Sequence, residues 1–201
     1  KDETLSMLDK YKDRISWISE PDRGQSDAMN KGIRMAKGEI IGWINADDYY
    51  LPGAVQAVAR EFVTQPDISM VHGDGWVEDL NGRVLHKVRA GEANAKSILI
   101  RNQVFYPAFV KKAVFNEIGY FDEMLHFCMD YDMWIRIITR YKIRHVPVQI
   151  VAKTRHPQTK SVLNSTSMMM EAEKVKLKHL DTPEAKIILG NDYLKIKQFC
   201  F

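Results

Sequence analysis

The chain has 201 residues, of which 45% are hydrophobic and 27% are charged. These proportions are typical of one soluble globular domain with a single core, and they exclude a disordered or fibrous chain. The 29 basic and 26 acidic residues leave a formal charge of +3. That charge is too weak and too evenly spread to indicate a nucleic-acid partner, and we expect none.

The cysteines and the apolar segments indicate the cellular compartment of the protein. Cys128 and Cys200 lie far apart in the sequence, which excludes a cysteine zinc site and argues against a disulfide framework. No stretch approaches the ~18 uninterrupted apolar residues of a membrane span, and the N-terminus has no signal-peptide pattern. We therefore expect a cytoplasmic protein that does not cross a membrane.

Hydrophobic periodicity predicts alternating helices and strands at the start of the chain. Leu5, Leu8 and Tyr11 recur at helical spacing, whereas 39–44 is a continuous apolar run, as in a strand buried on both faces. The expected elements are a helix over 2–13, a strand over 15–18, a helix over 28–37, a strand over 39–44, a helix over 53–65 and a strand over 68–71. This order indicates an α/β protein with a parallel or mixed sheet flanked by helices.

The rest of the chain is less regular. Leu80-Asn81-Gly82 is a hairpin signal between two strand-like runs. The expected elements are strands over 76–79 and 83–88, helices over 94–100, 111–118 and 130–141, a strand over 143–151 and a mainly helical segment over 165–200. Lysines and acids are mixed along 171–197, which indicates a solvated face or, alternatively, an amphipathic surface that touches a membrane or a partner.

The sharpest polar signal follows the expected strand over 39–44. Asn45, Asp47 and Asp48 lie where that strand ends, and ligands of open α/β sheets bind at the carboxyl ends of strands. Adjacent carboxylates form a hard oxygen site suited to Mg²⁺ or Mn²⁺, which takes its remaining ligands from water and phosphate. The alternative is that Asp47 or Asp48 caps the helix that begins near Pro52.

Two further segments carry polar side chains. Asp130 and Asp132 open an expected helix; a carboxylate there can cap the helix, or it can act as a general base if it faces a pocket. The basic loop over 155–161, which contains His156 and Lys160, follows an expected strand. It could clamp phosphate or hold a metal, or it could be a solvated surface loop.

Together these segments resemble the family 2 inverting glycosyltransferases of the GT-A fold. The resemblance rests on 19–32 (SEPDRGQSDAMNKG), 38–48 (GEIIGWINADD), 116–123 (NEIGYFDE) and 130–136 (DYDMWIR), followed by the late loop with His156. It implies a Rossmann-like mixed, mostly parallel sheet flanked by helices. It also implies a glycosyltransferase domain over 1–161 and a helical C-terminal extension over 162–201.

The resemblance implies a donor site with a divalent cation, Mn²⁺ or Mg²⁺. Asp47 matches the last aspartate of the family's DxD motif, and Asp48 follows it as a neighbouring ligand. Asn45 stands where the first aspartate is usual, so an amide replaces a carboxylate there. His156 matches the family's histidine near the diphosphate, while Thr154 stands where an arginine is often found.

The resemblance also implies the remaining roles. Asp130 matches the general base that deprotonates the acceptor hydroxyl. The other implied substrate-binding residues are Gly24, Asp27 and Asn30 near the nucleoside and sugar, Asp132 and Trp134 on the acceptor side, and Lys160 in the late loop. Family members begin with a strand and an aspartate-containing turn that have no counterpart here, so the resemblance implies a domain that is incomplete at its N-terminus.

The expected function is therefore metal-dependent transfer of a sugar, with inversion, from a nucleotide-sugar to a hydroxyl acceptor. The acceptor is expected to be a saccharide or a lipid-linked molecule, in polysaccharide or glycolipid synthesis, with peripheral contact at the inner face of the membrane. Two alternatives stay open. One is a non-catalytic nucleotide-sugar or glycan-binding module, and the other is a metal-dependent phosphoesterase that uses Asp47, Asp48 and His156.

Overall fold

The computed structural model describes residues 2–198, so Cys200 lies outside the described residues. The strands are β1 (Ile40–Gly42), β2 (Tyr49–Tyr50), β3 (Met70–Glu78), β4 (Val84–Val88), β5 (Ala108–Lys111) and β6 (Ile143–Thr154). The helices are α1 (Thr4–Asp9), α2 (Gln25–Met35), α3 (Ala54–Thr64), α4 (Ala95–Ile100), α5 (Lys112–Ile118), α6 (Met129–Ile138), α7 (Lys160–Leu163), α8 (Ser165–Leu180), α9 (Pro183–Leu189), the 3₁₀ turn η1 (Gly190–Asp192) and α10 (Tyr193–Gln198).

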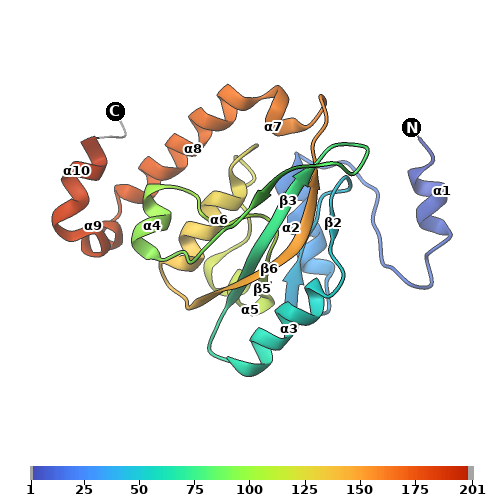
Figure 1. Cartoon of the computed structure of the whole chain (residues 1–201), viewed down its shortest axis with the longest axis horizontal. Helices are drawn as coiled ribbons and strands as arrows, with labels where there is room; N and C mark the ends of the chain where they lie inside the picture. Colours follow the sequence, from blue (N-terminus) through green and yellow to red (C-terminus); the bar gives the residue numbers. More distant parts are fainter. Residues whose placement is uncertain (1, 199–201) are drawn as a thin grey trace.

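The strands form one mixed sheet in the order β1-β5-β3-β6-β2, with β4 paired to β3 (Figure 1). The expected mixed α/β sheet is confirmed, but its mostly parallel character is wrong. Of the pairings among the described residues, only β3 with β6 is parallel. The reason is β5, which lies antiparallel between β1 and β3 and separates two strands that the strand-helix-strand order suggested as neighbours.

The sheet has an apolar core on each face. Successive strand residues point to opposite faces, and Met70 accordingly packs in a different cluster from Val71. On one face α3 places Ala54, Val58 and Phe62 against the sheet. The larger cluster on the other face includes residues of α4, α5, α6 and α8, and α3 lies on the opposite side of the sheet from α4 and α6 (Figure 1).

Helix α6 is the centre of the larger core. Most of its side chains are buried, and Trp134 is fully inaccessible. The Trp134 ring stacks on Trp43, with 5.3 Å between ring centroids. Because Trp43 follows β1, this stacking fixes the middle of α6 relative to the loop after β1.

The first twenty residues make few contacts with this body. α1 has no buried residue, and it stands apart from the sheet in Figure 1. The predicted strand over 15–18 is wrong: Ile15, Trp17 and Ile18 are 43%, 37% and 48% exposed. A strand needs a neighbour for its backbone groups, and among the described residues none pairs with this segment.

The C-terminal helices pack on the domain. Val175 and Leu180 of α8, with Ala185 and Leu189 of α9, belong to the same core cluster as α6. The expected helical segment is therefore confirmed, and its inner side contributes to the core. Within residues 2–198, the structure contains no helix that is long and apolar enough to cross a membrane.

Candidate active site

A cavity of about 740 Å³ opens where the loop after β1, the start of α6 and the segment after β6 meet. Its polar lining includes Asn45, Asp47, Asp48, Asp130, Lys153 and Lys160. Five of these six were candidates from the sequence. The structure therefore brings together the ends of three segments that lie far apart along the chain.

The loop after β1 is held by hydrogen bonds of its own side chains. Asp48 Oδ1 accepts from the backbone N–H of Thr154 at 2.9 Å, and Oδ2 accepts from Asn45 Nδ2 at 3.2 Å. Burial raises the pKa of the Asp48 carboxyl, while the Thr154 N–H opposes that rise. The capping alternative fails for both aspartates, because α3 begins after Gly53 with no side-chain cap.

Asp47 is the more open of the two aspartates. Its carboxylate is 40% exposed, and its Oδ2 lies 3.4 Å from Nε2 of His156. Among residues 2–198, no group of three or more His, Cys, Asp or Glu side chains is arranged to hold a metal. A carboxylate beside an imidazole nevertheless fits a divalent cation that takes its other ligands from phosphate oxygens and water. Asp48 differs, because both of its oxygens already accept hydrogen bonds from the protein.

Asp130 lies in the first turn of α6 and lines the same cavity. Its Oδ1 accepts from the backbone N–H of Tyr131 at 2.7 Å, so the helix-start alternative holds for it in part. Burial raises the pKa of the Asp130 carboxyl, while the Tyr131 N–H and the charge of Lys153 oppose the rise. A cavity-facing carboxylate with a raised pKa suits a general base.

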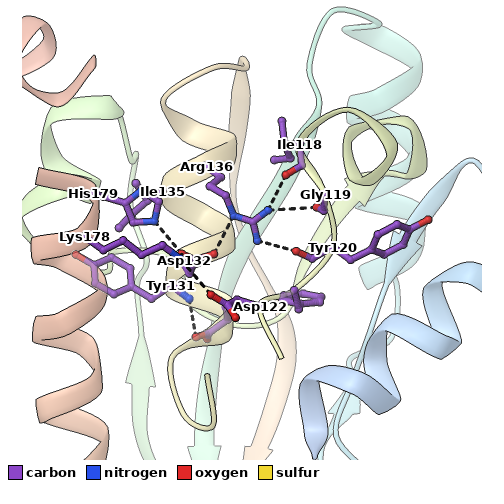
Figure 2. A network of polar contacts seen from close by, with 12 residues as sticks. Ile118, Gly119, Tyr120, Asp122, Tyr131, Asp132, Ile135, Arg136, Lys178 and His179 are labelled. Atoms are coloured by element: carbon purple, nitrogen blue, oxygen red, sulfur yellow. Dashed lines mark hydrogen bonds and ion pairs between the residues drawn. The ribbon is translucent and has the colours of Figure 1, made fainter. Parts of the chain in front are cut away.

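Asp132 and Trp134 point away from the cavity. Asp132 Oδ2 accepts from Arg136 Nε at 2.8 Å, and Oδ1 accepts from His179 Nε2 at 2.9 Å (Figure 2). Although burial opposes ionisation, the hydrogen bond from His179 and the charge of Arg136 hold the pKa of Asp132 well below its usual range. Trp134 is core, as described above. We therefore correct the expected substrate contacts of these two residues to contacts within the fold.

Figure 2 shows what the Asp132 network holds together. The Arg136 guanidinium donates to the carbonyl oxygens of Ile118, Gly119 and Tyr120 at 2.9 to 3.2 Å. Lys178 of α8 also reaches the Asp132 carboxylate, at 3.2 Å. One buried carboxylate thus joins α6, the loop after α5 and α8.

Gly24, Asp27 and Asn30, which were expected near the nucleoside, do not line the cavity. They stabilise the segment that contains them. Asp27 accepts from the backbone N–H of Arg23 at 3.0 Å, and Asn30 bonds both the N–H and the carbonyl of Phe121 at 3.0 Å. Gly24 precedes α2 with φ of 125°, a conformation that favours glycine. As a result, their neighbour Gln25 is held at the cavity wall, where Lys160 Nζ donates to its side-chain oxygen at 3.1 Å.

Two further residues of the cavity, Lys153 and His126, were not marked by the sequence motifs. Lys153 of β6 lies over the ring of Tyr106, with 5.2 Å from Nζ to the ring centroid, and both line the cavity. His126, just before α6, lines it as well. A lysine directly after the apolar run Ile150-Val151-Ala152 was the available signal for Lys153. His126 lies in an irregular segment and has no such signal.

Solved structures share this fold. A crystal structure of Staphylococcus aureus TarS 1-349 in complex with UDP-GlcNAc aligns with a TM-score of 0.66 at 16% identity, over 92% of this chain and 56% of that one. A mannosyltransferase from Pyrobaculum calidifontis in complex with GDP-Man and Mn²⁺ aligns with a TM-score of 0.59 at 15% identity, over 100% of this chain and 57% of that one. The expected GT-A-type fold is confirmed by these likenesses.

Sequence relatives point the same way. An uncharacterized glycosyltransferase of Rickettsia typhi is 24% identical over 96% of this chain and 64% of its own length. The uncharacterized glycosyltransferase YwdF of Bacillus subtilis is 29% identical over 64% of this chain and 49% of its own length. The chain thus spans about half to two thirds of these relatives. The model of the family described as "Glycosyl transferase family 2" matches residues 1–121, and the chain belongs to that family.

Proposed function

We propose that this domain transfers a sugar from a nucleotide-sugar donor to a hydroxyl acceptor with inversion at the anomeric carbon. The observation that carries the proposal is the shared cavity, which Asp47 and Asp130 line from different segments. An inverting transfer needs stabilisation of a leaving diphosphate and a base for the incoming hydroxyl. The two carboxylates divide that work.

On the donor side, Asp47 and His156 hold the end of the nucleotide-sugar that carries the diphosphate. When bound by these residues, Mn²⁺ or Mg²⁺ supplies positive charge to the diphosphate oxygens. Asn45 and Asp48 keep the loop in place through their mutual hydrogen bond. Complexes of two proteins with the same fold contain UDP-GlcNAc and GDP-Man, which supports a nucleotide-sugar as the donor class.

On the acceptor side, Asp130 takes the proton of the acceptor hydroxyl. The hydroxyl oxygen forms a new bond to the anomeric carbon as the bond from that carbon to the diphosphate oxygen breaks. The electron pair of the broken bond goes to the diphosphate, and the ammonium groups of Lys153 and Lys160 at the cavity wall favour that negative charge. Attack from the side opposite the leaving group inverts the configuration.

The acceptor class we propose is a saccharide or a lipid-linked saccharide in polysaccharide or glycolipid synthesis. One relative, 24% identical over 81% of this chain and 17% of its own length, is the chondroitin synthase of Pasteurella multocida. Action in the cytoplasm at the inner face of a membrane stays a prediction.

A thermal-shift titration of the full-length protein tests the donor site. UDP or GDP with Mn²⁺ should raise Tm, because a ligand at about 100 times its Kd stabilises the native state by about 2.7 kcal/mol. Asp47→Asn should abolish the part of the shift that depends on Mn²⁺. Asp13→Asn removes the same charge at an exposed position and should leave that part of the shift unchanged. If neither nucleotide raises Tm with or without Mn²⁺, the transferase proposal fails.

A further inference from the structure

The turn 126–128 sets the position of Asp130. It leads directly into α6, whose first residues are Met129 and Asp130. Cys128, the residue before the helix, makes no capping hydrogen bond with its side chain. The N–H groups of 126–128 precede α6 and take no part in its internal hydrogen bonds, so their partners come from another part of the chain.

Glu171 of α8 provides that hold. Its Oε2 accepts from the backbone N–H of His126 at 3.1 Å, while Oε1 accepts from the N–H groups of Phe127 at 2.6 Å and Cys128 at 2.7 Å. One carboxylate thus binds three consecutive N–H groups. A negative charge at this end of α6 is also favoured by the helix dipole.

The side chain of Lys160 also binds this turn. Lys160 of α7 donates through Nζ to the carbonyl oxygen of His126. The Cys128 thiol lies 3.4 Å from the carbonyl oxygen of Met168 in α8. The turn is therefore bound through both its N–H and its carbonyl groups by the segment 160–171, which begins in the late loop of the donor site.

We propose that Glu171 is a positioning residue for the transfer reaction: through its three hydrogen bonds, α8 fixes the turn 126–128 and thereby the place of Asp130 at the cavity wall. The inference rests on the proposed function, because it assigns Asp130 the role of base. Small displacements of a reacting group have large effects on rate, on the order of 100-fold for about 1 Å.

The charge of Glu171 gives the role a second readout. Its carboxylate adds to the burial that raises the pKa of Asp130, whereas Lys153 of β6 opposes the rise. The remaining charged or titratable side chains that line the cavity are Asp47, Asp48, His86, Tyr106, His126, Arg155 and Lys160. Loss of the Glu171 charge should therefore lower the pKa of Asp130 and extend the acid side of the pH-rate profile to lower pH.

Hydrogen-deuterium exchange of the full-length protein tests the hold directly. Glu171→Ala should speed exchange of the N–H groups in 126–131 on the order of tenfold or more, with other core peptides unchanged. Glu171→Gln should have a smaller effect, because its one carbonyl oxygen can still accept hydrogen bonds. It also serves if the alanine variant does not fold. Glu184→Gln, an exposed glutamate in the first turn of α9, is the matched control.

Kinetics then separate positioning from a purely structural role. Glu171→Gln should lower kcat on the order of tenfold, leave the donor KM unchanged and shift the acid limb of the kcat/KM profile downward by roughly a few tenths of a pH unit. Unchanged exchange at 126–131 overturns the inference. Faster exchange with unchanged kcat and pH profile overturns it too. A wild-type protein that binds no nucleotide refutes the proposed function instead, and the exchange result stays readable.

Discussion

The carboxylate of Asp48 accepts a hydrogen bond from the backbone N–H of Thr154, with 2.9 Å between the two atoms. This contact lies beside the pairing of Tyr49 in β2 with Ala152 in β6, and it joins the loop between β1 and β2 to the last residue of β6. Asp47 directly precedes Asp48, and His156 lies two residues after Thr154. The contact therefore brings the side chains of Asp47 and His156 within 3.4 Å of each other. The donor side of the cavity is therefore fixed by the sheet itself.

Replacing Asp130 by asparagine separates catalysis from binding. Asp130→Asn keeps the size of the side chain and removes the base, so transfer should fall by about 100-fold or more while nucleotide binding stays near wild type. Because burial raises the pKa of Asp130, wild-type transfer should decline as pH falls through that raised value, where the base becomes protonated.

Steady-state transfer rates from pH 5 to 8, with nucleotide affinity measured in parallel, check this prediction. Loss of nucleotide affinity in the Asp130→Asn protein would contradict it, since Asp130 would then be part of the donor site or of the fold. Asn45→Ala, on the donor side of the same cavity, is a useful comparison because it should affect donor binding.

Arg136 should be important for stability. The side chain of Asp132 is 2% exposed and that of Arg136 is 16% exposed. Arg136→Met leaves the Asp132 carboxylate without its closest cation and removes the donors to three backbone carbonyls. Breaking a buried pair in this way costs about 3 to 5 kcal/mol.

Urea unfolding of Arg136→Met and of Arg140→Met measures the difference. Arg140 lies just after α6 and is exposed, so its replacement should change the free energy of unfolding by less than about 0.5 kcal/mol. A loss below about 1 kcal/mol in Arg136→Met would show that the network of Figure 2 contributes little to stability.

His72 should make the fold sensitive to acid. It is fully buried in β3, and neither ring nitrogen has a hydrogen-bond partner among the described residues. Burial, with a smaller effect of the neighbouring His145, lowers the pKa of His72 to about 4. The unfolded chain therefore binds this proton at higher pH than the native state does, so stability is complete above pH ~6.5 and falls as the pH drops toward 4.

The free energy of unfolding at pH 7 and pH 4.5 tests this for wild type and His72→Leu. Wild type should lose about 2 to 3 kcal/mol more than His72→Leu over that interval. The exposed His86→Gln should behave as wild type. Equal losses in wild type and His72→Leu would contradict the prediction.

The local elements could be predicted because their causes are local. Apolar residues at helical spacing indicated α2, α3 and α6, and Leu80-Asn81-Gly82 indicated the β3–β4 hairpin, both as found. The strand over 15–18 failed because pairing depends on a neighbour, which no local pattern reports. The expected mostly parallel pairing failed for the same reason, since nothing in the sequence of β5 says that it enters between β1 and β3.

In the candidate site, too, only the residues with a local sequence signal could be predicted. Asp47 and Asp130 were found because carboxylates at the end of a strand and the start of a helix are local signals. Lys153 and Glu171 were not, because their importance comes from segments that meet only in the folded chain. Asp132 shows the converse: it shares a helical turn with Asp130, yet its side chain points to α8 instead of the cavity.

The pairing of β3 with β6 has a consequence for synthesis of the protein. These central strands are parallel neighbours, and their paired residues are more than 70 positions apart, as in Met70 with Ile143. Closing so long a loop is slow compared with forming local helices. While the ribosome extends the chain from β3 to β6, one edge of β3 stays open, and such edges favour association with other chains. Pairing of β6 with β3 is therefore a late event in folding, and chaperone binding should be concentrated in the interval before β6 emerges.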